Sequence, residues 1–136
     1  LFMIILSLLL LTFPLFGQSK EVGVLYQYET SSGIQWKTSG DSFFQPQYKG
    51  EISNGKPDGL GILYNGVYLK RFYNLPKVKF IGEWENGKIH GQGTLTLSGG
   101  MKKIGEFRGG SPWNITSYDK NRNILGMWVN GKLKVK

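Results

Sequence analysis

Three glutamates and one histidine are the side chains of this sequence best suited to acid–base chemistry. Glu51, Glu83 and Glu106 each follow a glycine in similar local sequences. A catalytic acid and a catalytic base need different environments, because one must hold a proton that the other has lost. Carboxylates that recur at one position of a repeat share an environment. We therefore predict an exposed row of glutamates that pairs with lysines on neighbouring strands, and not a catalytic pair.

His90 is the only histidine, and the chain has no cysteine. A lone histidine without clustered carboxylates makes a poor metal site, so we expect a structural or loop role for it. Zinc–thiolate sites, iron–sulfur clusters and thiol nucleophiles are excluded. No serine nucleophile elbow, phosphate-binding loop or dinucleotide-binding glycine pattern is present in the sequence. We expect no catalytic residue, no cofactor, no metal and no small-molecule substrate.

The composition limits the class of protein. The 136 residues include 20 glycines, 14% aromatic residues and a formal net charge of +8. Glycine is roughly twice its usual share of about 7%, yet it has no collagen period. The aromatic content argues against disorder, and the length fits one domain. The charge is uneven, since residues 48–136 carry 15 basic and six acidic side chains.

Four related stretches account for most of the glycines. They share an aromatic-x-Gly-Glu-apolar-x-Asn-Gly skeleton, which the first two extend by a Gly-x-Gly pair. They read YKGEISNGKPDGLG at 48–61, FIGEWENGKIHGQG at 80–93, KIGEFRGG at 103–110 and ILGMWVNG at 124–131. This pattern resembles the MORN (membrane occupation and recognition nexus) repeat. The resemblance implies a ribbon of antiparallel hairpins with an aromatic-lined groove that binds proteins or self-associates, without catalysis.

The second copy shows why such a unit becomes a hairpin. Alternation over residues 80–85 places Phe80 and Trp84 on one face and Glu83 on the other. Asn86-Gly87 is a strong signal for a tight turn, and we predict a returning strand over Gln92–Ser98. The central glycine of each first strand is expected to make room for a neighbouring ring. A hairpin alone is marginal, whereas stacked copies bury a continuous apolar row.

We therefore predict an all-β fold, an elongated array of stacked antiparallel hairpins. Its copies lie near 48–66, 80–100, 103–123 and 124–136, with an insertion near 67–76. Residues 18–47 are expected to form a capping β segment with strands at Val22–Tyr28, Ile34–Lys37 and Ser42–Phe44. The final lysine-rich stretch 132–136 should pack Leu133 and Val135 and expose its lysines, which discourages aggregation of an edge strand.

The first 17 residues have the character of a signal peptide. Residues 1–16 are uncharged and almost entirely apolar, and Gly17 provides a small residue before a cleavage site. The run is shorter than the 20 or so residues that span a bilayer, although an uncleaved membrane anchor is the alternative. Export without disulfides suggests the periplasm or cell envelope of a bacterium, or its medium. We expect a signal helix ahead of the array.

Two functional hypotheses follow. The first is a protein-interaction or scaffold module, in which the inserted aromatic residues add exposed contacts to the row of repeat aromatics. The second is binding to an anionic membrane surface, to which each basic residue near the surface contributes about 1 kcal/mol. Export argues against nucleic acid as a partner. The candidate residues are Tyr68, Phe72, Tyr73 and Trp84 for the first hypothesis and Lys70, Arg71, Lys77, Lys79, Lys102 and Lys103 for the second.

Overall fold

The computed structural model describes residues 20–64 and 78–135, and this part of the chain is built of β-strands and turns. The predicted signal helix at 1–17 and the whole insertion near 67–76 lie outside the described residues, so the structure does not place them. Within the described ranges, no helix is long and apolar enough to cross a bilayer. The strands are β1 (Glu21–Thr30), β2 (Gly33–Lys37), β3 (Gln47–Ser53), β4 (Lys56–Tyr64), β5 (Lys79–Glu85), β6 (Lys88–Thr96), β7 (Lys102–Arg108), β8 (Ser111–Tyr118), β9 (Ile124–Val129) and β10 (Lys132–Val135).

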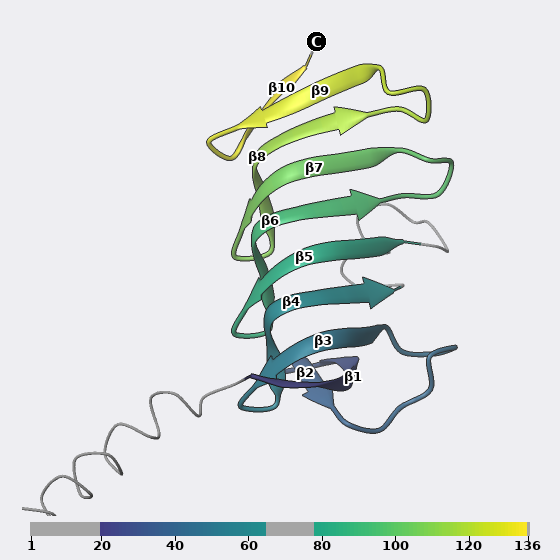
Figure 1. Ribbon diagram of the computed structural model, residues 1–136, viewed down its shortest axis with the longest axis vertical. Helices are drawn as coiled ribbons and strands as arrows, with labels where there is room; N and C mark the ends of the chain where they lie inside the picture. Colours follow the sequence, from purple (N-terminus) through teal and green to yellow (C-terminus); the bar gives the residue numbers. More distant parts are fainter. Residues whose placement is uncertain (1–19, 65–77, 136) are drawn as a thin grey trace, which may run out of the picture.

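All ten strands form one open antiparallel sheet, which confirms the predicted all-β class. The strand order is β10-β9-β8-β7-β6-β5-β4-β3-β1-β2. From β3 onward each strand therefore pairs with the strand that follows it in sequence, and Figure 1 shows the strands stacked along the long axis of the molecule. At the N-terminal end, β1 pairs with β3, and β2 forms the sheet edge.

Residues Ser42–Phe44 form a turn, so the prediction of a third N-terminal strand is wrong. The Asp41 carbonyl accepts hydrogen bonds from the backbone N–H groups of Phe44 and Gln45, at 3.0 and 2.7 Å. The Asp41 side chain accepts the N–H of Phe43 at 2.9 Å. A short polar side chain that bonds its own backbone favours a turn over a strand. The Phe43 and Phe44 side chains are consequently exposed.

The three described Asn-Gly pairs, at 54–55, 86–87 and 130–131, make tight turns, as the sequence predicts. Asn86 and Gly87 have φ angles of 49° and 83°, which is the geometry of a two-residue turn matched to the twist of its strands. Because the turn uses only these two residues, β6 begins at Lys88 and ends at Thr96. The predicted start at Gln92 is therefore too late.

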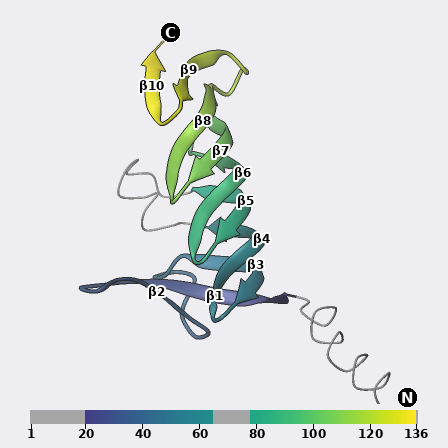
Figure 2. The ribbon, with the colours of Figure 1, turned by 90° about the vertical axis from the view of Figure 1, so that its left-hand side faces the viewer.

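One face of the sheet carries the hydrophobic core. Tyr48, Phe80, Trp84 and Phe107 are buried, which agrees with the predicted alternation. Their rings meet edge to face, with centroids 5.2 Å apart for Tyr48 and Trp84, 5.7 Å for Phe80 and Trp84, and 5.1 Å for Phe80 and Phe107. This arrangement brings the positive ring edge onto the negative ring face, and each such pair adds about 0.5–1.5 kcal/mol beyond the burial of area. Figure 2 shows how strongly the strands curve around this core.

The rings lie over the second glycine of each Gly-x-Gly pair. An ideal Cβ on Gly61 would lie 2.2 Å from the Tyr48 ring, and one on Gly93 would lie 2.2 Å from the Phe80 ring. The central glycine of the first strand has a different neighbour, because a Cβ on Gly82 would strike the backbone of the facing strand at 2.5 Å. The predicted room for a ring is therefore provided mainly by the returning strand.

We expect Gly93→Ala to lower the free energy of unfolding by about 1–3 kcal/mol, because the buried Phe80 ring has no space to yield. Gly23→Ala is the matched control, since its Cβ would meet only the flexible end of Ile52, at 3.1 Å. Urea unfolding followed by tryptophan fluorescence measures both. Equal losses in the two variants would contradict this account of the glycine pair.

Candidate interaction groove

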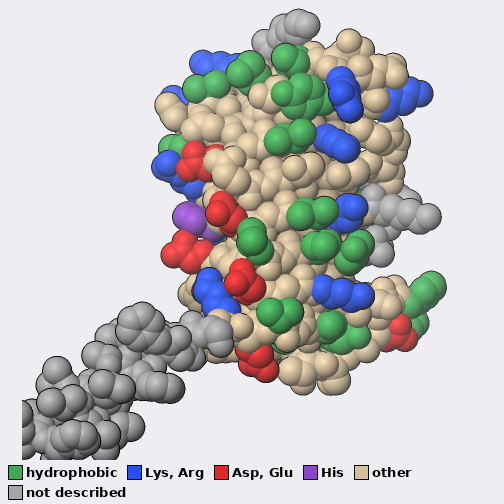
Figure 3. All heavy atoms as spheres, viewed as in Figure 1, with side chains coloured by type: hydrophobic (Ala, Val, Ile, Leu, Met, Phe, Trp, Pro, Cys, Tyr) green, Lys and Arg blue, Asp and Glu red, His purple; other side chains and the backbone are tan. Residues whose placement is uncertain are grey.

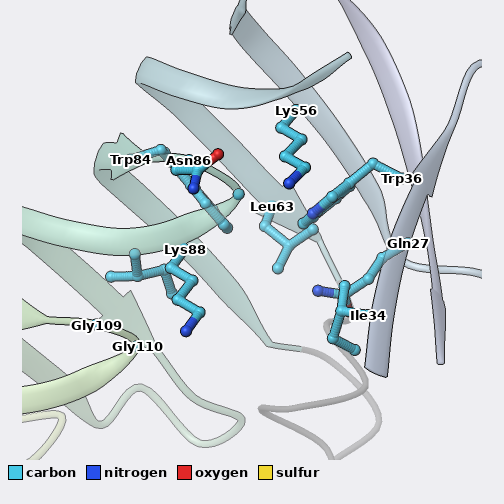
Figure 4. Close-up of a pocket in the computed structure, with 12 residues that line it drawn as sticks. Gln27, Ile34, Trp36, Lys56, Leu63, Trp84, Asn86, Lys88, Gly109 and Gly110 are labelled. Atoms are coloured by element: carbon cyan, nitrogen blue, oxygen red, sulfur yellow. The ribbon is translucent and has the colours of Figure 1, made fainter. Parts of the chain in front are cut away.

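A groove lined by core residues lies near the hairpin turns and is our candidate site. Its volume is about 380 Å³. Figure 4 shows Gln27, Ile34 and Trp36 of the N-terminal hairpin along one wall. Trp84 and the turns around Gly87 and Gly110 form the other wall.

Trp36 forms part of the groove wall that the N-terminal hairpin provides. It lies on the edge strand β2, yet its ring packs edge to face against Tyr48 and Trp84, with centroids 6.0 Å away in both pairs. Its indole Nε1 also lies 3.0 Å from the position of an ideal Cβ on Gly87, so this glycine lets the turn approach the ring. The N-terminal hairpin thus folds onto the array and builds half of the groove.

Gln27 supplies a polar group at the base of this apolar site. Its side chain is 6% exposed and lines the groove. Among the residues that the structure describes, its Oε1 atom has no hydrogen-bond partner. A buried polar atom without a partner costs about 1–3 kcal/mol. Because Oε1 is closed to solvent, the Gln27 side chain would have to turn toward the groove before a ligand could donate a hydrogen bond to this atom and remove that cost.

Basic side chains and turn backbone surround the opening. Lys56 and Lys88, which each follow an Asn-Gly turn, are exposed and line the groove on two successive hairpins. The only other side chain of the lining that is both polar and exposed is Asn86. The described part of the lining therefore offers an apolar floor, one buried acceptor and a positive rim.

The turns that form the groove wall are held by a repeating backbone bond. The N–H of Gly87 donates to the Pro57 carbonyl at 2.8 Å, and the N–H of Gly110 donates to the Ile89 carbonyl at 2.9 Å. The N–H of Gly131 donates to the Trp113 carbonyl at 2.9 Å. Each turn is thus attached to the hairpin before it.

A side chain of the preceding hairpin accepts a second N–H from each turn. The N–H of Asn86 donates to Asp58 at 3.2 Å, and that of Gly109 donates to His90 Nδ1 at 3.1 Å. The N–H of Asn130 donates to the Asn114 side chain at 2.9 Å. His90 also lies beside Glu85, with Nε2 3.2 Å from a carboxylate oxygen. The single histidine therefore has a structural role in docking a turn.

Two of the repeated glutamates bind backbone, so the prediction that this row pairs with cross-strand lysines is wrong for them. The Glu51 carboxylate accepts the N–H of Leu60, and the Glu83 carboxylate accepts that of Gln92. Both bonds lie where the pairing register of the hairpin shifts. The returning strand bulges toward the carboxylate because it contains a Gly-x-Gly pair.

The third copy lacks that glycine pair, and its geometry changes. Asn114 and Thr116 stand at the two glycine positions, and Gly105 pairs with Ile115 where the second copy pairs Gly82 with Gly93. The register is therefore displaced by one residue. Here the glutamate, Glu106, forms an ion pair with Arg108 at 2.8 Å.

The described residues that the sequence predicted to bind do not form one surface. Trp84 is 5% exposed and belongs to the core as well as to the groove wall. Lys102 and Lys103 point to opposite faces of β7, because side chains alternate along a strand. The Lys103 ammonium lies 5.9 Å from the centre of the Trp128 ring on the core face. Tyr68, Lys70, Arg71, Phe72, Tyr73 and Lys77 lie outside the described residues.

Sequence reasoning missed Trp36, Gln27, Lys56 and Lys88 as groove residues. Lys56 and Lys88 occupy the same position after their Asn-Gly turns, so the repeat itself was a usable signal. Trp36 and Gln27 gave no comparable signal. They lie in the segment without the repeat, and their contacts in the groove are made with residues far along the chain.

The fold and the turn geometry define an antiparallel hairpin-repeat protein. The sequence pattern of the MORN repeat family matches residues 48–68 and 80–102. The chain therefore carries MORN repeats at these two places, which overlap the β3–β4 and β5–β6 hairpins. The β7–β8 and β9–β10 hairpins continue the same sheet beyond the matched residues. No curated protein matches the chain.

Asp58 should make turn docking sensitive to acid. The Lys20 ammonium donates to its carboxylate at 2.9 Å, and this bond, with the bond from Asn86, holds the pKa of Asp58 below its usual range. A carboxyl whose pKa is lower in the folded state stabilises the fold above the unfolded pKa of about 3.9. That contribution is lost as the pH falls through the folded pKa.

We expect Asp58→Asn to lower the urea midpoint at neutral pH, and the difference from the unmodified chain to shrink below about pH 4. Lys20→Met removes the main cause of the lowered pKa and should show part of the same pH-dependent loss. A difference that stays constant between neutral and acidic pH would show that the Asp58 charge does not support the turn.

Proposed function

We propose that this protein is a non-catalytic interaction module whose groove binds a segment of a protein partner. The observation that carries the proposal is the groove lined by Trp36 and Trp84. It combines an apolar floor, the unpartnered Gln27 Oε1 and a basic rim. Pockets of this composition suit an apolar side chain anchored by a few placed polar groups.

The lining also indicates the chemistry of the partner. A large apolar or aromatic side chain would fill the apolar groove beside the two packed indole rings, and a backbone N–H next to it would donate to Gln27 once that side chain turns toward the groove. Acidic residues next to the anchor would meet Lys56 and Lys88. We therefore expect an acidic segment with one aromatic or large aliphatic anchor, and this pattern is typical of hot spots at protein interfaces.

Export is part of the proposal. The apolar run of residues 1–16, followed by a small residue, supports a signal peptide or an N-terminal anchor. The partner would then be met in a bacterial cell envelope or outside the cell, and the module would serve there as a scaffold.

Binding to an anionic membrane has less support as an alternative. The described lysines of the suggested basic surface are divided, since Lys79 and Lys102 lie on one face of the sheet and Lys103 lies on the other. Sedimentation with vesicles of phosphatidylcholine and phosphatidylserine tests this hypothesis. Binding at low salt that fell steeply with added salt would favour it over the groove.

The groove proposal predicts the outcome of a peptide selection. A phage-displayed random peptide library, selected on the full chain, should yield sequences with an aromatic or large aliphatic residue beside acidic residues. Trp36→Ala should weaken the binding of the selected peptides by about tenfold or more, because it removes one wall of the groove. Phe43→Ala is the matched control, since Phe43 is 86% exposed and does not line the groove.

Fluorescence titration of synthetic peptides measures both variants, and circular dichroism checks that each remains folded. Lys56→Glu combined with Lys88→Glu should reduce the affinity for acidic peptides. Selected peptides that lack this pattern, or that bind Trp36→Ala as tightly as the unmodified chain, would refute the assignment of the groove.

A further inference from the structure

The face of the sheet opposite the core, which we call the outer face, carries an ordered apolar row. Strand register places Ile62 beside Ile81, Ile81 beside Thr94, Thr94 beside Ile104, and so on to Thr116 and Met127. Ile81, Ile104 and Met127 are 43–44% exposed. Each member of the row is paired directly with the next one. These side chains therefore form one continuous line across six strands.

Charged side chains flank this row with opposite signs on its two sides. β5 presents Lys79, Ile81 and Glu83 on the outer face, and β7 presents Lys102, Ile104 and Glu106. The glutamates lie toward the hairpin turns, where Glu106 is already paired with Arg108, and the lysines lie toward the other ends of the strands. In Figure 3 acidic side chains gather mainly on the turn side, where basic side chains stand among them, whereas apolar and basic side chains fill the middle and the opposite side.

This order is self-complementary under one symmetry, except at Lys49 and Lys134, which end the row and would each face the same residue of the second copy. A twofold axis that runs along the apolar row, in the plane of contact, exchanges the two sides of the face. It places Ile81 opposite the same residue of a second copy, and the Lys79 side of one copy over the Glu83 side of the other. A twofold axis parallel to the strands would instead place glutamates over glutamates, and like charges in contact cost several kcal/mol.

We propose that two copies of this chain associate through their outer faces, with the twofold axis along the apolar row. The two sheets then pack as an aligned sandwich about 10 Å apart, with the isoleucine and methionine side chains between them. The contact is isologous, as in most closed homodimers. In Figure 1 no described segment crosses the outer face, so a second sheet can approach it.

The proposed dimer leaves the groove free, because the groove lies on the core face. Self-association and partner binding are therefore independent, and either can fail without the other. Together they would give an assembly with two partner-binding grooves on its two outward surfaces.

Site-specific crosslinking tests the symmetry. The chain has no cysteine, so Ile81→Cys introduces a single thiol at the axis. A short bismaleimide suits the test, because facing sheets about 10 Å apart exceed the reach of a disulfide. We expect a crosslinked dimer from Ile81→Cys, and far less from the control Phe43→Cys, whose exposed position lies in the turn between β2 and β3 and not in the row. Equal yields from the two variants would overturn the proposal.

Charge reversal tests the complementarity. Lys79→Glu combined with Lys102→Glu puts acidic side chains on both sides of the row, and should raise the dimer dissociation constant by about tenfold or more. Lys56→Glu combined with Lys88→Glu makes the same change in net charge at the groove and should leave the constant nearly unchanged. Sedimentation equilibrium of the full chain measures it, with a mild detergent in every sample because residues 1–16 are apolar.

A chain that stays monomeric over the whole concentration series would refute the dimer. Loss of association only in the groove variant would do so as well, because it would place the contact on the core face. Failure of the peptide selection, with the crosslink retained, would remove the proposed groove function and leave the dimer standing.

Discussion

The packing of an aromatic ring over a glycine in the facing strand is the contact on which this structure depends. Tyr48 covers Gly61 and Phe80 covers Gly93, and in each case a single methyl group would occupy the space of the ring. The rings can then turn their edges toward Trp84 and Phe107 and form a ladder along the sheet. A single sheet has no second layer to cover it, so this ladder and the curvature of the strands provide the core.

The glycine pairs also determine the polar contacts at the turn ends of the hairpins. Where Gly-x-Gly is present, the returning strand bulges toward a glutamate, which accepts a backbone N–H from it. In the third copy, where asparagine and threonine replace the glycines, the register is displaced by one residue. The docking acceptors are displaced equally, from Ile89 and His90 to Trp113 and Asn114. The turn keeps its two bonds to the preceding hairpin although the residues that provide them change.

Local signals in the sequence predicted the repeated part of the fold. The Asn-Gly pairs specify their turns, and alternation assigns Phe80, Trp84 and Glu83 to their faces, because both features depend on neighbouring residues. The errors arose where side chains bond to backbone. Asp41 converts the apolar Ser42–Phe44 stretch into a turn, and the bulges give Glu51 and Glu83 backbone partners in place of lysines. The groove could not be predicted from neighbouring residues in the sequence, because it depends on a contact between Trp36 and Trp84 across three intervening strands.

The docking bonds of the turns all run in one direction. The turns of the β5–β6, β7–β8 and β9–β10 hairpins each donate two N–H groups to the hairpin that precedes them, and so the donors face the N-terminal end of the array and the acceptors face the C-terminal end. The stack consequently has a polarity, like a filament with unlike ends. A duplicated hairpin inserted between two others would receive and donate the same bonds as its neighbours, so an array of this kind can lengthen during evolution without redesigning any existing contact.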